Sequence, residues 1–309
     1  MATSASRPSP HAQNAVHETA GGEGIIKSPE QVVDVVEAHA SHHRIPDRIE
    51  WPDANRVAVN LTVDFDAMLL RKLLDEPPMQ LGKGEFGGRV GVWRLLELFR
   101  RHNVSATFFV PGRICELYPD AVRQAAADGH EVADHMWEHR VPADYEIERA
   151  HLVRTADALA ATTGIRPIGS RSWHDADLMS ELGYLYNSHD AADDRPHFVT
   201  TDSGTELVSL PFHYTWDDAM YFNFAWLNTE NSAQRMADSD RVLELWWDAF
   251  QQQYKVGGYL NLCLHPEFSG RSLRIDMLDE LIRRMKSFDG VWFSTCADVA
   301  RHMLGAGRS

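Results

Sequence analysis

The sequence predicts an α/β protein built on a largely parallel sheet that is either open or closed into a barrel. Two observations support this fold class. Strand-like and helix-like patterns alternate over about 250 of the 309 residues, which is typical of repeated β-α-β units. Several predicted strands also end in acidic or histidine residues, and in such folds the chemistry collects at the carboxyl ends of the strands.

The clearest strand is the alternating segment 57–63, which ends in Asp64 and Asp66. A second predicted strand, 131–133, leads into His135. A third leads into His265. Because parallel strands present their carboxyl ends on one rim, these side chains are expected to meet there.

Helix boundaries follow from the residues that start and stop helices. Pro119 begins one helix and Gly129 ends it, as the preferences of these residues predict. Between 189 and 231 the patterns are irregular, and we expect loops and short strands that form an interface or a pocket lid. The other predicted elements are helices near 93–99, 144–164, 241–254 and 276–288, strands at 106–110, 258–264 and 291–293, and a strand-helix stretch over 171–183.

The chain is expected to contain one catalytic domain, residues 25–309, preceded by a disordered arm, residues 1–24. The arm is rich in Ser, Ala, Pro and Gly and has almost no large apolar residues, so it cannot offset its ordering entropy. It also lacks the basic start and apolar stretch of a secretory signal, and we expect a cytoplasmic protein.

Composition excludes several classes of partner. The chain has 30 Lys and Arg against 45 Asp and Glu, a net charge of −15, so a nucleic acid would meet net repulsion. No apolar run approaches the roughly 18 residues of a membrane span. Three cysteines without CxxC spacing predict neither a disulfide framework nor a zinc knuckle, which fits a reducing compartment.

The pair His135 and His139 predicts a metal site. A spacing of four residues lets two imidazoles converge on one ion, and Asp66 is our candidate for the third ligand. Two imidazoles and one carboxylate suit a divalent first-row ion, with Zn²⁺ preferred and Co²⁺, Ni²⁺ or Mn²⁺ also compatible.

The same segment also fits the HxxEH pattern of inverted metallopeptidases, in which Glu138 would be the base. That interpretation needs a continuous helix. A strand approach precedes His135 and Pro142 follows His139 closely, which leaves little room for one.

Four motifs in order resemble the polysaccharide deacetylases of the NodB type, in particular the branch with proteins similar to allantoinases, cyclic imide hydrolases and peptidoglycan deacetylases. The resemblance covers residues 56–304 and rests on Val63–Ala67, His135–His139, Gly169–Trp173 and Leu262–Pro266. It implies a distorted (β/α) barrel with fewer strands than a TIM barrel, and a homo-oligomer, either a dimer or a tetramer.

The resemblance also implies roles for single residues. Asp66, His135 and His139 would hold the metal, Asp64 would be the general base and His265 the general acid. Arg171 corresponds to the arginine that orients the catalytic acid. This chain departs from the sugar-active pattern in two places, because Phe65 separates the two acids and the bulky sequence Met-Trp-Glu occupies 136–138.

The expected function is metal-dependent hydrolysis of a non-peptide amide or imide bond. A small cyclic imide or amide is slightly preferred as substrate, because no secretion signal is present and the bulky residues 137–138 suggest a narrow pocket. The alternative is N-deacetylation of an amino sugar, as in peptidoglycan or chitin. A carbohydrate-binding barrel without turnover and the inverted metallopeptidase are further alternatives.

Aromatic residues divide into two groups. Trp93, Trp246 and Trp247 fall at helical positions and are expected in the core. The substrate wall is expected from four residues in or beside the motifs or in the irregular stretch: Trp137, Glu138, Trp173 and Trp216.

Asp217 and Asp218 are interpreted either as loop acids or as substrate contacts.

Overall fold

The computed structural model describes residues 42–73, 78, 81–223 and 236–306. The predicted arm, residues 1–24, and the end of the predicted irregular stretch, 224–231, lie outside these ranges. No helix in the described part of the chain is long and apolar enough to cross a membrane.

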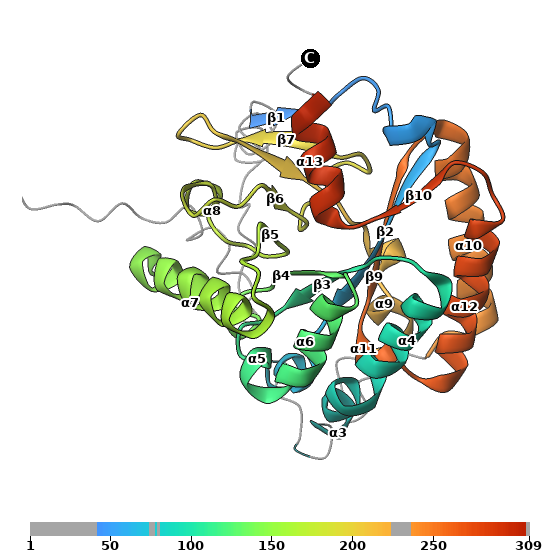
Figure 1. The fold of residues 1–309 in the computed structure, drawn as a ribbon, viewed down its shortest axis with the longest axis horizontal. Helices are drawn as coiled ribbons and strands as arrows, with labels where there is room; N and C mark the ends of the chain where they lie inside the picture. Colours follow the sequence, from blue (N-terminus) through green and yellow to red (C-terminus); the bar gives the residue numbers. More distant parts are fainter. Residues whose placement is uncertain (1–41, 74–77, 79–80, 224–235, 307–309) are drawn as a thin grey trace, which may run out of the picture.

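One curled sheet forms the centre of the molecule, and helices cover its outer face (Figure 1). Along the sheet the strands follow the order β1-β7-β8-β6-β5-β4-β3-β2, and both β9 and β10 pair with β2. The strands are β1 (His43–Arg44), β2 (Val57–Asp64), β3 (Thr107–Val110), β4 (Glu131–Asp134), β5 (Gly169–Ser170), β6 (Tyr186–Asn187), β7 (His197–Thr200), β8 (Glu206–Ser209), β9 (Tyr259–Leu264) and β10 (Val291–Ser294).

Parallel pairing joins β10, β9, β2, β3, β4, β5, β6 and β8, whereas β7 is antiparallel to β8 and β1 is antiparallel to β7. The predicted α/β class and the distorted (β/α) barrel are confirmed. The antiparallel hairpin lies in the stretch from 189 to 231, where the expected short strands are present. The strand-helix stretch at 171–183 differs in detail, because β5 ends one residue before Arg171.

The helices lie close to their predicted ranges. Asp144 caps the longest one by accepting a hydrogen bond from the Ile147 N–H, and Gly164 ends it in a left-handed conformation. The helices are α2 (Met68–Leu73), α3 (Leu81–Phe86), α4 (Val92–His102), α5 (Ile114–Leu117), α6 (Pro119–Ala127), α7 (Tyr145–Thr163), α8 (Ala176–Glu181), α9 (Ala219–Phe222), α10 (Ser239–Val256), α11 (Pro266–Ser269), α12 (Ser272–Lys286) and α13 (Cys296–Ala306), together with the π-helical turn η5 (Gly87–Gly91) and the 3₁₀ turns η3 (Pro52–Ala54) and η6 (Tyr214–Trp216).

The alternation of side chains along β2 separates the core from the site. The odd-numbered residues from Val57 to Val63 pack in the main core with α4, α6, α10 and α12. Asn60, Thr62 and Asp64 therefore lie on the opposite, inner face. Because β2 and β9 are parallel and pair up to Val63 and Leu264, the next residues of both strands emerge side by side at the rim.

Candidate metal and catalytic site

Asp66 lies just beyond β2, where the chain turns sharply. Ala67 has a φ of 49°, a left-handed conformation that is uncommon outside glycine. The turn carries the Asp66 carboxylate inward, where it is fully buried. Neither of its oxygens has a hydrogen-bond partner among the described residues. A buried carboxylate without partners is costly, so this group is expected to face a cation.

The two histidines are carried by a tight turn after β4. Met136 and His139 have φ values of 68° and 58°. The loop after β3 holds the turn, because the N–H groups of Gly112 and Arg113 donate to the carbonyls of residues 136 and 137. The segment is not helical, so the structure contradicts the condition on which the inverted metallopeptidase interpretation depends.

The imidazoles face the Asp66 carboxylate. His135 Nε2 lies 3.5 Å from one of its oxygens and His139 Nε2 lies 3.5 Å from the other. His135 Nδ1 lies 2.5 Å from the carbonyl oxygen of Arg171, and a carbonyl only accepts, so this nitrogen carries the proton. The Nε2 atom of His135 faces the carboxylate and has no hydrogen-bond partner among the described residues.

These three side chains fit a divalent cation. Their ligand atoms lie within 4.8 Å of one another. Metal-bound histidines commonly donate their second ring N–H to a carbonyl, as His135 does. Two imidazoles and one carboxylate leave a coordination position for water, which is the arrangement of a catalytic rather than a structural site.

Asp64 forms a buried ion pair with Arg171. Arg171 Nη1 lies 2.5 Å from Asp64 Oδ1. The other guanidinium hydrogen bonds go to Thr62, Ser188, Asn261 and the Cys263 sulfur. Burial raises the pKa of Asp64, but Arg171 and the nearby imidazoles outweigh it and lower that pKa to about 2. Asp64 is therefore ionised at neutral pH.

His265 is held by Asp218, a residue for which the sequence left two interpretations open. The His265 Nδ1–H donates to Asp218 Oδ1 at 2.7 Å, and Nε2 lies 4.0 Å from Asp66. Burial lowers the pKa of His265, yet Asp218 and Asp217 raise it well above its usual range. Burial raises the pKa of Asp217 to about 6. Asp218 is thus a positioning residue. The only feature of the sequence that pointed to this role was its place in a Trp-Asp-Asp sequence inside the irregular stretch.

A second buried pair lies beside the site and was missed by sequence reasoning. Arg71 on α2 and Glu267 on α11 lie 3.7 Å apart, and both side chains are fully buried. Burial raises the pKa of Glu267 to about 7: the charge of Asp66 acts in the same direction, and the charges of His265 and Arg71 oppose it without cancelling it. The glycines of η5 allow this turn to pack closely against α11, because a Cβ on Gly91 would overlap the Pro266 carbonyl oxygen.

The four predicted substrate contacts lie in different surroundings. The Trp173 ring packs edge-on against His139, with 5.9 Å between centroids. Trp137 is buried, with two guanidinium groups over its ring. Glu138 accepts a hydrogen bond from Arg113, and Trp216 lies in the main core. Trp173 alone among the four makes a described ring contact with a candidate metal ligand.

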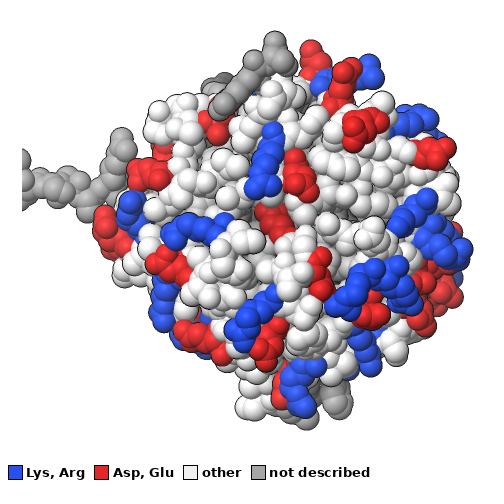
Figure 2. Space-filling model, in the orientation of Figure 1, with Lys and Arg blue, Asp and Glu red and all other residues white. Residues whose placement is uncertain are grey.

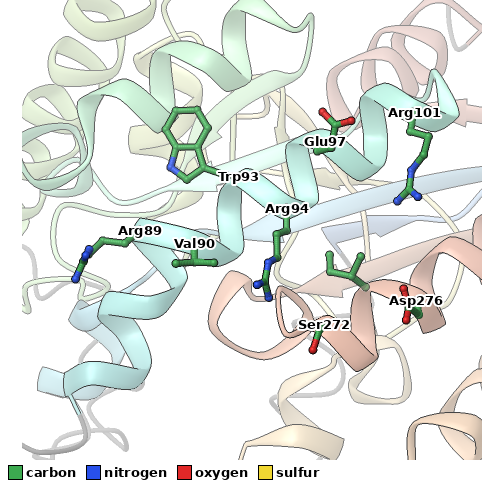
Figure 3. A pocket seen from close by; sticks show the side chains of 9 residues that line it. Arg89, Val90, Trp93, Arg94, Glu97, Arg101, Ser272 and Asp276 are labelled. Atoms are coloured by element: carbon green, nitrogen blue, oxygen red, sulfur yellow. The ribbon is translucent and has the colours of Figure 1, made fainter.

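An open groove of about 570 Å³ lies elsewhere, between α4 and α12 (Figure 3). Its lining includes Arg94, Arg101 and Asp276 but none of the site residues. Trp93 also lines it and is 39% exposed, so the prediction that Trp93 is a core residue was wrong, whereas Trp246 is fully buried as predicted. Figure 2 shows acidic and basic side chains interspersed over the face that it presents.

Comparisons with known proteins show what this chain is similar to. Residues 84–174 match the family model of polysaccharide deacetylases. A peptidoglycan deacetylase of Helicobacter pylori is 24% identical over 287 residues, covering 81% of this chain and 97% of the relative.

Two solved structures share most of the fold. A protein of Mycobacterium smegmatis assigned to the polysaccharide deacetylases is 30% identical, with a TM-score of 0.79, covering 86% of this chain and 96% of its own. The allantoinase PuuE is 25% identical, with a TM-score of 0.74, and the match covers 84% of this chain and 93% of the allantoinase.

Proposed function

Because this chain belongs to the polysaccharide deacetylase family, we propose that it is a metal-dependent hydrolase that removes an acyl group from the nitrogen of an amino sugar. One observation carries the proposal. The buried Asp66 carboxylate has no hydrogen-bond partner among the described residues and faces two imidazoles at 3.5 Å, and Asp64 and His265 lie beside it.

Asp66, His135 and His139 would hold the ion, and Zn²⁺ is our first choice. A divalent ion in such a site polarises an amide carbonyl and makes a nearby water more acidic. Asp64 is ionised and fixed by Arg171, so it can accept the proton of the attacking water as the new carbon-oxygen bond forms. His265 then gives a proton to the departing nitrogen as the carbon-nitrogen bond breaks, and Asp218 stabilises its protonated form.

A second candidate is hydrolysis of a small cyclic amide or imide, which the sequence had slightly preferred. The similarity to an allantoinase favours it, as does the burial of Asp64, His135 and His265, each 6% exposed or less. We rank the amino sugar first because the relative from H. pylori, matched over nearly its whole length, is a peptidoglycan deacetylase.

Substrate and metal can be tested together. The purified protein and Asp66→Ala are assayed for bound metal, and both are tested on N-acetylated sugar oligomers, peptidoglycan fragments, allantoin, hydantoin and succinimide. We expect acetate release from the sugars by the wild type and loss of one bound ion in Asp66→Ala. Hydrolysis confined to the cyclic compounds would establish the second candidate, and metal binding without any hydrolysis would favour a carbohydrate-binding barrel. Equal metal contents would refute the ligand assignment.

Location and assembly remain predictions of this proposal. We propose a cytoplasmic homo-oligomer, either a dimer or a tetramer. Cell fractionation tests the first statement and light scattering of the purified protein tests the second. Recovery outside the cytoplasm would remove one of the arguments for a small substrate.

A further inference from the structure

A second group of two imidazoles and one carboxylate lies at the antiparallel edge of the sheet. His43 belongs to β1, His197 begins β7, and Asp190 lies in the loop that follows β6. Their ligand atoms lie within 4.8 Å of one another. None of the three belongs to the site proposed above for hydrolysis.

His197 has the hydrogen-bond pattern of a metal ligand. Its Nδ1 lies 3.0 Å from the carbonyl oxygen of Arg195, so Nδ1 carries the proton and donates it. Its Nε2 is buried and faces Asp190, with 3.1 Å between Nε2 and Oδ2. His135 shows the same pattern in the first site, with Nδ1 held by a carbonyl and Nε2 facing an aspartate. A carbonyl acceptor on the second ring nitrogen is the usual support of a metal-bound histidine.

The other two groups complete the set. His43 Nδ1 lies 3.9 Å from the same oxygen of Asp190, and the rings of His43 and His197 are 4.8 Å apart between centroids. Ligand atoms about 2.0–2.1 Å from a tetrahedral ion are about 3.4 Å apart, so small side-chain adjustments would bring these atoms to a common centre. The side chains of His43, Asp190 and His197 are 12%, 24% and 0% exposed. An ion held between them would therefore be partly accessible to solvent.

We propose that His43, Asp190 and His197 bind a second divalent first-row ion, such as Zn²⁺, Co²⁺ or Ni²⁺. Imidazole and carboxylate ligands suit these ions. The ion would join three segments that are far apart in the sequence. It would also brace one wall of the first site, because His189 precedes Asp190 and its ring packs on Trp173.

The test is a count of bound ions in four full-length proteins: the wild type, Asp66→Ala, His197→Gln and the double variant. Each is dialysed against Zn²⁺ and analysed by mass spectrometry for metal per chain. We expect two, one, one and no ions respectively. Loss in Asp66→Ala reports on the first site and loss in His197→Gln on the second, so either assignment can fail without the other.

His42→Gln is the matched control, because His42 is a neighbouring histidine with 43% side-chain exposure, and this variant should retain two ions. Zn²⁺ should also raise the melting temperature of Asp66→Ala but not that of the double variant, since an ion bound only to the folded state stabilises it. If His197→Gln does not fold, His43→Gln replaces it in the same scheme. An unchanged ion count in a folded His197→Gln or His43→Gln variant would overturn the proposal.

Discussion

The Nδ1 atom of His265 lies 2.7 Å from Oδ1 of Asp218, and the second Asp218 oxygen accepts the backbone N–H of His265 at 2.9 Å and the hydroxyl of Ser269. One carboxylate therefore fixes both the ring and the backbone of the proposed acid. Its negative charge also favours the protonated imidazole, which is the form that can give a proton to a leaving nitrogen.

Asp218→Asn should lower kcat by about tenfold to a thousandfold, a large part of what general acid catalysis supplies. An acid is active below its pKa, and Asp218 raises the pKa of His265. The variant should therefore lose activity at a lower pH than the wild type on the alkaline side of its profile. The pH dependence of kcat measures this shift, and metal content should stay unchanged. Asp217→Asn is the control, because Asp217 lies 3.7 Å from the same nitrogen and makes the weaker contact. If the wild type and Asp218→Asn lost activity at the same alkaline pH, the role of Asp218 as the positioning residue of His265 would be contradicted.

Asp64→Asn should abolish most activity while retaining the metal, whereas Glu138→Gln should have little effect on either. Asp64 is ionised and lies 3.7 Å from His135, whereas the Glu138 carboxylate is occupied by Arg113. Initial rates and metal content of both variants measure the difference. The opposite order of rates would restore Glu138 as the base.

Much of this site could be predicted from sequence because the polar residues follow strands with clear patterns. The position of Asp64, Asp66 and His265 follows from the ends of two strands, β2 and β9, and parallel pairing brings those ends together. The partner of His265 could not be predicted, because Asp218 comes from an irregular segment whose path depends on packing against β9.

The limits of local patterns also explain the errors. Trp93 has helical spacing, but spacing does not reveal that its side of α4 faces an open groove. The position of Glu267 was missed because α11 packs closely against glycines in a π-helical turn, a feature without a periodic signature.

Arg171→Met should destabilise the protein by about 3–5 kcal/mol, because it leaves Asp64 buried without its cation. The double variant Arg171→Met with Asp64→Asn should recover part of this loss, since the uncompensated charge is then absent. Urea unfolding of the wild type, both single variants and the double variant gives the coupling free energy. If the losses of the two single variants in free energy of unfolding simply added in the double variant, the ion pair would not be the cause of the destabilisation.

His130 should make the folding stability depend on pH below neutrality. Its ring is buried between Phe99 and Phe108, and its Nδ1 accepts the backbone N–H of Ala106. Burial is the main cause that lowers its pKa from 6.5 to about 4. The unfolded chain therefore binds more protons than the folded chain between these values, and the contribution of His130 falls as the pH falls through this window.

His130→Gln removes this titration but leaves an amide that can accept the same hydrogen bond. We expect the wild type to lose about 1–2 kcal/mol more than the variant between pH 7.5 and pH 5, as measured by urea unfolding at both values. His42→Gln, which changes a half-buried histidine, should follow the wild type. A buried neutral imidazole must lower the free energy of unfolding once the pH is low enough to protonate it in the unfolded chain. Equal losses in the wild type and His130→Gln would therefore show that the His130 ring is not the group that titrates.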